Sequence, residues 1–139
     1  MKSSEWTVGQ VAEQFDLPTN VLRHWETVGL LRPRRDSAGR RRYTRDDVVR
    51  VAVIHRSKGA GMSLDQIRVL LDSEARGRHE VLQAHVADLD RRMEEMRISR
   101  EMTLHAFECD AHDVTACPNF RAWVDDRLSG FLATADAAS

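Results

Sequence analysis

The chain has 139 residues, of which 42% are hydrophobic and 31% are charged; this is the size of one modest domain and too apolar for a disordered chain. No apolar run approaches the roughly 18–20 residues that a membrane span needs, and the start, MKSSEWTVGQ, lacks the apolar block of a signal peptide. These features exclude a membrane protein and predict a cytoplasmic one.

The net charge of −1 conceals a strong asymmetry between the two halves of the chain. Residues 1–70 carry 13 lysines and arginines against 8 acidic residues, whereas residues 71–139 carry 8 against 14. The excess is concentrated between Arg23 and Lys58, where 11 basic side chains face only four acidic ones. This clustering predicts that the first half binds a polyanion, and double-stranded DNA is the candidate.

Two short helices joined by a tight turn are predicted near the start. Thr7 and Gln10 have the spacing of a capping box, which predicts a helix over residues 8–15. Pro18 interrupts the pattern, Thr19 is a candidate cap for the next helix, and Gly29 is expected to end it. This order is typical of a helix-turn-helix, whose second helix enters the major groove.

The following segment, LLRPRRDSAGRRRY, contains Pro33 and Gly39 and cannot be a continuous helix. It predicts a short hairpin, or wing, with six arginines within 11 residues. So dense a cluster of like charge favours a surface that meets an anionic partner.

Two more helices are predicted beyond the wing. Thr44 and Asp47 begin one that extends to about Lys58, and Ser63 and Gln66 form a third capping box.

A long uninterrupted helix is predicted from about His79 to Phe107, a stretch without proline or glycine that would be roughly 40 Å long. One stripe of mainly apolar residues follows this helix in alternating steps of four and three. Its members are Leu82, Val86, Leu89, Met93, Met96, Arg100, Thr103 and Phe107. This 3.5-residue repeat is typical of a coiled coil. Because little chain remains to cover the stripe, a homodimer is favoured over a helix bundle within one chain.

The last segment begins with a loop bounded by Cys109 and Cys117. Pro118 suits the first turn of a short final helix over about 118–129, which Gly130 is expected to close. Residues 131–139 are then expected to be a loose tail.

These elements, in this order, resemble the MerR family of regulators over about residues 5–128. The specific part is VGQVAEQFDLPTNVLRHWETVGLLRPRRDSAGRRRYTRDDVVRVAVI. The residues that match the family pattern in the second helix and the wing are Val21, Leu22, Arg23, Glu26, Gly29, Leu30, Arg35, Gly39, Arg41, Tyr43 and Val48. The chain departs from the pattern at His24, Trp25 and Arg40.

The resemblance implies a mainly α-helical homodimer with a winged helix-turn-helix at each end of an antiparallel coiled coil. It further implies binding to a near-palindromic promoter element, where an effector changes the shape of the DNA for RNA polymerase. The implied organisation is a DNA-binding domain over residues 1–75, a dimerisation helix over 76–108 and an effector-binding segment over 109–139.

Arg23 is the first candidate for contact with DNA, because a guanidinium within the second helix reaches a phosphate or a guanine edge. Trp25 is expected to lie in the core, and a contact of its indole N–H with a phosphate is left open as the alternative. The full set of expected DNA contacts is Thr19, Asn20, Arg23, His24, Arg34, Arg35, Arg40, Arg41, Arg42 and Tyr43.

The loop C-x7-C-P resembles the metal-binding loop of copper(I)-sensing members. Cys109 and Cys117 are the expected ligands of Cu(I) or Zn(II), and His105 and His112 are candidate additional ligands. Two cysteines cannot hold the iron–sulfur cluster of the redox members, which takes four. A reversible disulfide, an organic effector and two inert thiols remain open alternatives.

Other classes of protein fit less well. An enzyme is not expected, because the chain has no glycine-rich phosphate loop, no nucleophile elbow and no room for a substrate pocket beside the cysteines. An architectural DNA-binding protein or a dimeric scaffold remains an alternative, since a DNA-binding module carries no record of its output.

Overall fold

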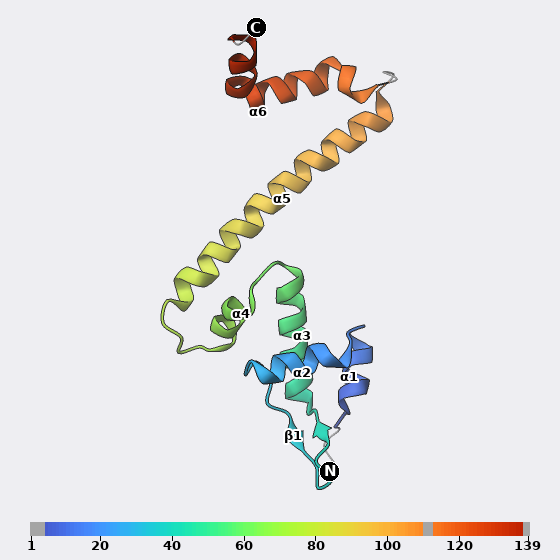
Figure 1. Ribbon diagram of the computed structural model, residues 1–139, viewed down its shortest axis with the longest axis vertical. Helices are drawn as coiled ribbons and strands as arrows, with labels where there is room; N and C mark the ends of the chain where they lie inside the picture. Colours follow the sequence, from blue (N-terminus) through green and yellow to red (C-terminus); the bar gives the residue numbers. More distant parts are fainter. Residues whose placement is uncertain (1–4, 110–112, 138–139) are drawn as a thin grey trace. The chain divides into compact units, whose positions relative to one another are not determined.

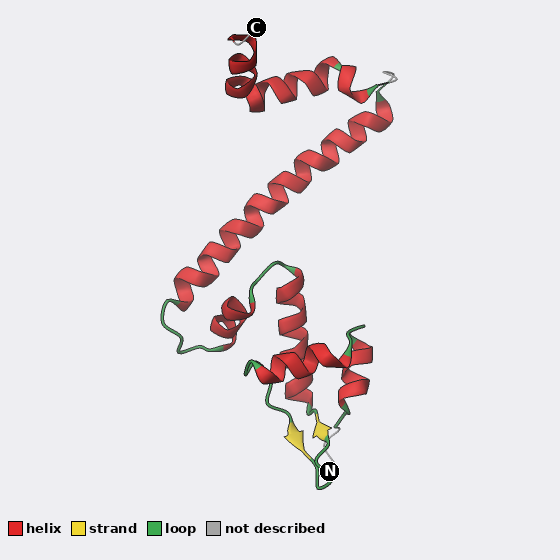
Figure 2. Ribbon diagram, viewed as in Figure 1, coloured by secondary structure: helices red, strands yellow, loops and turns green. Residues whose placement is uncertain are grey.

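The computed structural model describes residues 5–109 and 113–137, which form helices and one small hairpin (Figures 1 and 2). The chain divides into two compact units, residues 1–87 and 88–139, with the boundary inside the long helix α5. Each unit is described separately.

The helix-turn-helix consists of α1 (Val8–Gln14) and α2 (Thr19–Thr27). The capping box predicted at the start of α1 is confirmed: Thr7 Oγ1 accepts from the Gln10 N–H at 3.1 Å, and Gln10 Oε1 accepts from the Thr7 N–H at 2.9 Å. The prediction that Thr19 caps α2 is wrong. Pro18 is the N-cap and makes no side-chain cap bond, and Thr19 already lies inside the helix, where its hydroxyl cannot reach forward to a free N–H.

The wing is a two-stranded antiparallel hairpin of β1 (Arg34–Arg35) and β2 (Arg41–Arg42). Asp36 shapes its turn by accepting hydrogen bonds from the backbone N–H groups of Ala38 (2.9 Å) and Arg40 (3.0 Å). Gly39 in this turn has φ of 79°, a conformation that favours glycine. The base of the wing is joined to the N-terminal segment, because Trp6 and Tyr43 exchange two backbone hydrogen bonds of 2.9 and 2.8 Å.

Two further helices, α3 (Arg45–Gly59) and α4 (Leu64–Leu71), complete the first unit. Their predicted capping boxes at Thr44 with Asp47 and at Ser63 with Gln66 are both present. The core joins all of these elements, and its buried members are Val11, Ala12, Leu22, Trp25, Leu30, Leu31, Tyr43, Val51, Ile54, Met62 and Ile67. Trp25, 5% exposed, lies in this core as predicted.

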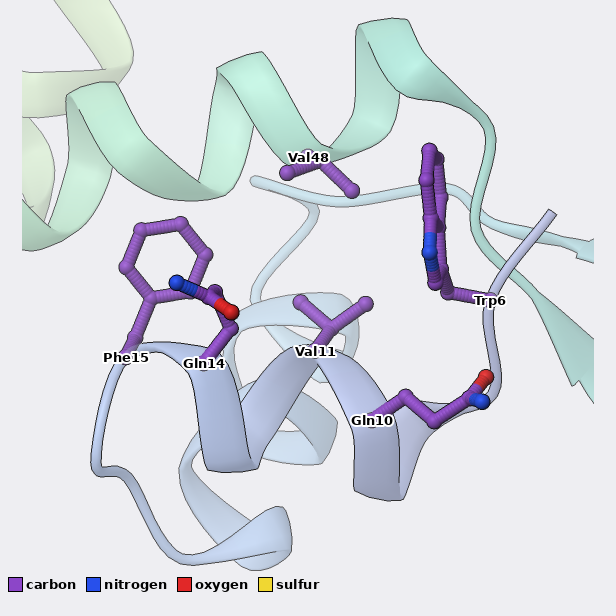
Figure 3. Close-up of a pocket in the computed structure, with 6 residues that line it drawn as sticks. All are labelled: Trp6, Gln10, Val11, Gln14, Phe15 and Val48. Atoms are coloured by element: carbon purple, nitrogen blue, oxygen red, sulfur yellow. The ribbon is translucent and has the colours of Figure 1, made fainter. Parts of the chain in front are cut away.

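A hollow of about 240 Å³ lies between α1 and α3 (Figure 3). Trp6 and Phe15 stand at its two ends, and Val11 of α1 and Val48 of α3 lie between them (Figure 3). Its other lining residues are Gln10 and Gln14. None of these lining side chains is titratable or a usual metal ligand. The hollow is therefore not a candidate site for binding a phosphate or a metal ion.

The long helix α5 (Arg78–Glu108) confirms the uninterrupted helix predicted from the sequence. None of its residues is buried. Along the predicted stripe, Met93 is 68% exposed, Met96 72% and Phe107 83%, so that nothing in the described part of the chain covers these side chains.

After a short 3-10 turn, Val114–Ala116, the chain ends in α6 (Pro118–Ala137). The predicted start at Pro118 is confirmed, but the prediction that Gly130 closes the helix before a loose tail is wrong. The helix bends at Leu128 (φ −116°, ψ 17°) and then continues to Ala137 (Figure 1). A glycine ends a helix by adopting positive φ, and Gly130 is not among the positive-φ glycines.

Among the described residues, no helix combines the length and the apolar character that a membrane span requires.

Candidate functional site

The exposed face of α2 carries three of the side chains predicted to contact DNA. Asn20, Arg23 and His24 are exposed, whereas Thr19 at the start of the helix is half-buried. Leu22 and Trp25, which alternate with them along the helix, are buried in the core. The apolar side of α2 therefore fixes the helix in place while its polar side faces outward.

The wing arginines divide by exposure and by partner. Arg34, Arg35 and Arg40 are exposed, whereas Arg41 and Arg42 are half-buried. Within the wing, Asp36 pairs with Arg40 at 3.4 Å and with Arg42 at 3.3 Å. The N–H of Arg40 and the neighbouring guanidinium groups lower the pKa of the Asp36 carboxyl, which therefore stays ionised.

A second carboxylate joins the wing to α2. Arg41 donates to Glu26 through Nε, and Arg35 lies 3.5 Å from the same carboxylate. Two internal acids thus hold four of the six wing arginines, which explains how so dense a cluster of positive charge is tolerated in one hairpin.

The helix α2, which we call the recognition helix because it is the one predicted to enter the major groove, meets the wing at a hollow of about 280 Å³. It is lined by Thr7, Val8, Arg23, Gly39, Arg40, Arg41 and Arg42. The structure therefore brings Arg23 of α2 together with three wing arginines, an arrangement that suits a phosphate group.

Tyr43 differs from its prediction as a DNA contact. Its side chain has no exposed surface, and burial raises the pKa of its hydroxyl. Its backbone N–H and C=O are already bonded to Trp6. Tyr43 therefore supports the wing from inside the core, and because its side chain is buried and its backbone is bonded to Trp6, we leave it out of the DNA contacts that we propose.

The second candidate site lies where α5 ends and α6 begins. His105 is in the last turn of α5, Cys109 directly follows that helix, and Cys117 directly precedes α6. His105 Nε2 lies 2.9 Å from Cys117 Sγ, and the two sulfur atoms are 3.6 Å apart. All three potential ligand atoms lie within 4.8 Å of one another, so that the structure brings together three of the four predicted ligands. His112, the fourth, lies outside the described residues.

Cys117 is placed to be a thiolate. It is 2% exposed and stands immediately before the first residue of α6, so that backbone N–H groups of that first turn point towards its sulfur. Hydrogen bonds from Phe120 N–H, the His105 ring and Asn119 N–H lower the pKa of the Cys117 thiol from 9.0 to about 7. A thiolate is the form that binds a soft metal ion.

The described part of the loop is held by its own side chains. Asp113 accepts hydrogen bonds from the N–H (2.9 Å) and the hydroxyl (2.6 Å) of Thr115. Arg121 of α6 donates Nε to the carbonyl of Thr115 at 3.0 Å. These bonds position Cys117 independently of any metal.

The donor set fits a thiophilic ion. A tetrahedral ion with metal–sulfur bonds of about 2.3 Å separates two sulfur ligands by about 3.8 Å, close to the observed 3.6 Å. Cys109, Cys117 and His105 would together offer such an ion two sulfur donors and one imidazole.

Comparison with known proteins agrees with this architecture. Residues 6–74 match the family described as "MerR HTH family regulatory protein", and residues 48–104 match "MerR, DNA binding". The regulator HmrR of Rhizobium leguminosarum is 31% identical over 120 residues, which cover 80% of this chain and 92% of that protein. The chain belongs to the MerR family of transcriptional regulators.

A further relative and two solved structures extend the comparison. A "probable heavy metal-dependent transcriptional regulator" of Haemophilus influenzae is 30% identical, with 79% of this chain and 92% of the relative covered. Among solved structures, the lead(II) complex of PbrR691 from Ralstonia metallidurans is 27% identical with a TM-score of 0.52, covering 85% of this chain and 98% of that one. HiNmlR, described as a MerR family regulator lacking the sensor domain and bound to promoter DNA, shares the fold at 22% identity and a TM-score of 0.61, with 73% and 83% covered.

The MerR assignment makes this chain a DNA-binding transcriptional regulator whose relatives are regulators and not enzymes. Sequence reasoning found the arginines of this MerR protein but missed the two acids that hold them. In the sequence, Glu26 is a match to the family pattern and Asp36 a turn residue, and neither is assigned to an arginine, although each stands close in sequence to the arginine-rich segment. Their position beside these arginines was the available signal.

Proposed function

We propose that this MerR protein is a homodimeric regulator that binds a near-palindromic promoter element and changes the shape of that DNA when a thiophilic metal ion binds. The observation that carries the metal proposal is the cluster of His105, Cys109 and Cys117, whose ligand atoms lie within 4.8 Å. Two sulfur donors and one imidazole suit Zn(II) or Cu(I).

The proposed DNA contacts come from α2 and the wing. In this proposal, Arg23 binds at a base edge or phosphate and the wing arginines bind the backbone on either side. The complete proposed set is Thr19, Asn20, Arg23, His24, Arg34, Arg35, Arg40, Arg41 and Arg42. The exposure of Asn20, Arg23 and His24 and the hollow that Arg23 shares with the wing support this assignment.

The functional division that we propose is DNA binding by residues 1–75, dimerisation by 76–108 and metal sensing by 109–139, with RNA polymerase acting on the reshaped promoter. The exposed stripe of α5 supports the dimer. Val86, Met93 and Met96 are more than half exposed in the single chain, and a stripe with a 3.5-residue repeat becomes buried when a second helix packs against it.

Anaerobic titration of the reduced protein tests the metal site. With either Zn(II) or Cu(I) as the probe, we expect one tightly bound ion per chain and release of thiol protons on binding. Replacing both cysteines by serine (C109S/C117S) should remove this binding. As a matched control, His55→Ala alters an exposed histidine of α3, in the first unit of the chain, and should leave it unchanged. Equal metal affinity in wild type and the double serine variant would refute the proposal.

A thiol redox switch is the second candidate, because the two sulfur atoms are only 3.6 Å apart and a reversible disulfide needs such proximity. The two candidates give different results. A redox switch responds to a peroxide in the presence of a metal chelator, whereas a metal sensor under the same chelation does not respond.

A further inference from the structure

The long helix α5 carries two classes of charged side chain. Seven of them pair within the helix, through Asp88 with Arg91 and Arg92, Glu95 with Arg91, and Arg97 with Glu94 and Glu101. Asp90 and Arg100 are exposed and, like Glu80 and Glu108 near the two ends of the helix, have no ion-pair partner among the described residues. Asp90 and Arg100 are of opposite charge and are not used by the helix itself.

Arg100 occupies an unusual place, because it belongs to the stripe. The stripe runs from Leu82 to Phe107 in alternating steps of four and three, and Arg100 is its one charged member. A charged residue at a seam position lowers the stability of a coiled coil but can set its register and partner. Its presence there raises the question of what receives the guanidinium.

The spacing of the stripe identifies the residues that face Arg100 in a dimer. This step rests on the homodimer of the proposed function. The stripe reads 4, 3, 4, 3, 4, 3, 4 and is therefore symmetric about a point between Glu94 and Glu95. Two antiparallel copies place all eight stripe residues opposite one another only when Leu82, which also packs on the core of its own chain, faces the partner's Phe107. In that register Arg100 faces the partner's Leu89. A shift of one heptad leaves stripe residues uncovered at the ends.

A seam side chain packs into a hole made by four residues of the facing helix. Opposite Arg100, that hole consists of the partner's Val86, Leu89, Asp90 and Met93. Three of these are apolar, and the fourth is the acid that has no ion pair with any described residue of its own chain. Arginine can lie along the apolar residues with its stem and reach Asp90 of the partner subunit with its guanidinium.

We propose that two symmetric ion pairs, Arg100 with the partner's Asp90, fix this register in the homodimer of the proposed function. The partner is a second copy of this chain, on grounds of charge complementarity and of the symmetry of the stripe. The pairs select this alignment, because in a parallel dimer each Arg100 would face the partner's Arg100, and the partner's Asp90 would lie ten residues, or about 15 Å, further along the helix.

Charge reversal tests the pair on the full-length protein, with the dimer dissociation constant measured by analytical ultracentrifugation. Arg100→Glu and Asp90→Arg each create two like-charge contacts and should each raise this constant at least about tenfold. In an equimolar mixture of the two variants, every contact is again between opposite charges, and heterodimers should form with a dissociation constant within about twofold of the wild-type value. This recovery also shows that neither variant has lost its fold.

Glu80→Arg is the matched control. Glu80 is exposed on the same helix, lies off the stripe and has no ion pair among the described residues, so that its reversal should leave the dissociation constant within twofold of wild type. Single reversals that dimerise like wild type, or a mixture that fails to form heterodimers, would overturn the Arg100–Asp90 pair while leaving the dimer itself in place. A wild-type protein that stays monomeric would overturn the proposed dimer.

Discussion

Arg41 on the second wing strand donates its Nε–H to the Glu26 carboxylate on α2. The bond joins two elements that are 15 residues apart in sequence, and both of its side chains are about three-quarters buried, at 24% and 23% exposure. It therefore sets the position of the wing relative to the recognition helix before DNA arrives, and a preformed site loses less conformational entropy when it binds.

The Glu26→Gln substitution tests this arrangement. It removes a negative charge from a DNA-binding surface, and simple electrostatics therefore predicts tighter binding. We expect the opposite, a loss of about three- to tenfold in affinity, because the charged partner of Arg41 and Arg35 is gone and the wing is no longer held. Fluorescence anisotropy with a labelled promoter duplex measures it. Tighter binding by the variant would show that Glu26 does not position the wing.

Arg23 is expected to contribute directly to binding. Arg23→Ala should weaken operator binding by more than about tenfold while dimerisation stays unchanged, because one contact to a base edge or phosphate is lost. Arg76→Ala, at an exposed arginine in the loop before α5, is the control and should have little effect. Wild-type affinity in Arg23→Ala would remove Arg23 from the interface.

Tyr43→Phe separates a core role from a DNA contact. The Tyr43 hydroxyl is buried and has no hydrogen-bond partner in the described structure, and an unsatisfied buried polar group costs stability. Removing it should leave the free energy of unfolding unchanged or raise it by about 1–2 kcal/mol, as measured by urea denaturation. DNA affinity should stay the same, whereas a marked loss of affinity in this variant would restore Tyr43 to the interface.

The lowered pKa of Cys117 gives a pH dependence for the metal-free, reduced protein. Ultraviolet absorbance of the thiolate should show a midpoint near pH 7, and His105→Ala should raise this pKa towards 9.0, because one of the hydrogen bonds to the sulfur is lost. Since the folded-state pKa lies below the ordinary value, the thiolate stabilises the fold in full above about pH 9, and this contribution disappears as the pH falls through about 7. A midpoint near 9 in the wild-type protein would contradict the assignment.

The parts of the fold that depend on local sequence were predictable. Thr7 with Gln10 and Ser63 with Gln66 are capping boxes whose two partners are three residues apart, so that the helix starts are encoded within one turn. The predictions that Thr19 caps α2 and that Gly130 ends α6 were wrong, because threonine and glycine also occur inside helices. Glycine ends a helix only with positive φ, and threonine caps one only from outside it.

The candidate sites show the same division. His105 and Cys109 are four residues apart at the end of one helix, so that their proximity follows from the helical repeat. The approach of Cys117 to both depends on how the loop returns to α6, which no local pattern encodes. Likewise, the pairing of Glu26 with Arg41 and the burial of Tyr43 follow from the packing of the wing on α2 and on the N-terminal segment, and only the folded structure reveals them.

Energy transfer between dyes at the two ends of a bound promoter duplex tests the central claim most directly. The duplex is first selected from a randomised pool by the protein itself, and Zn(II) or Cu(I) is then added without oxygen. We predict an inverted repeat whose transfer efficiency changes when metal is added to the wild-type complex and stays constant with C109S/C117S. A metal-induced change that persists in the double serine variant, or no change in either complex, would contradict a regulator that reshapes DNA through its cysteine site.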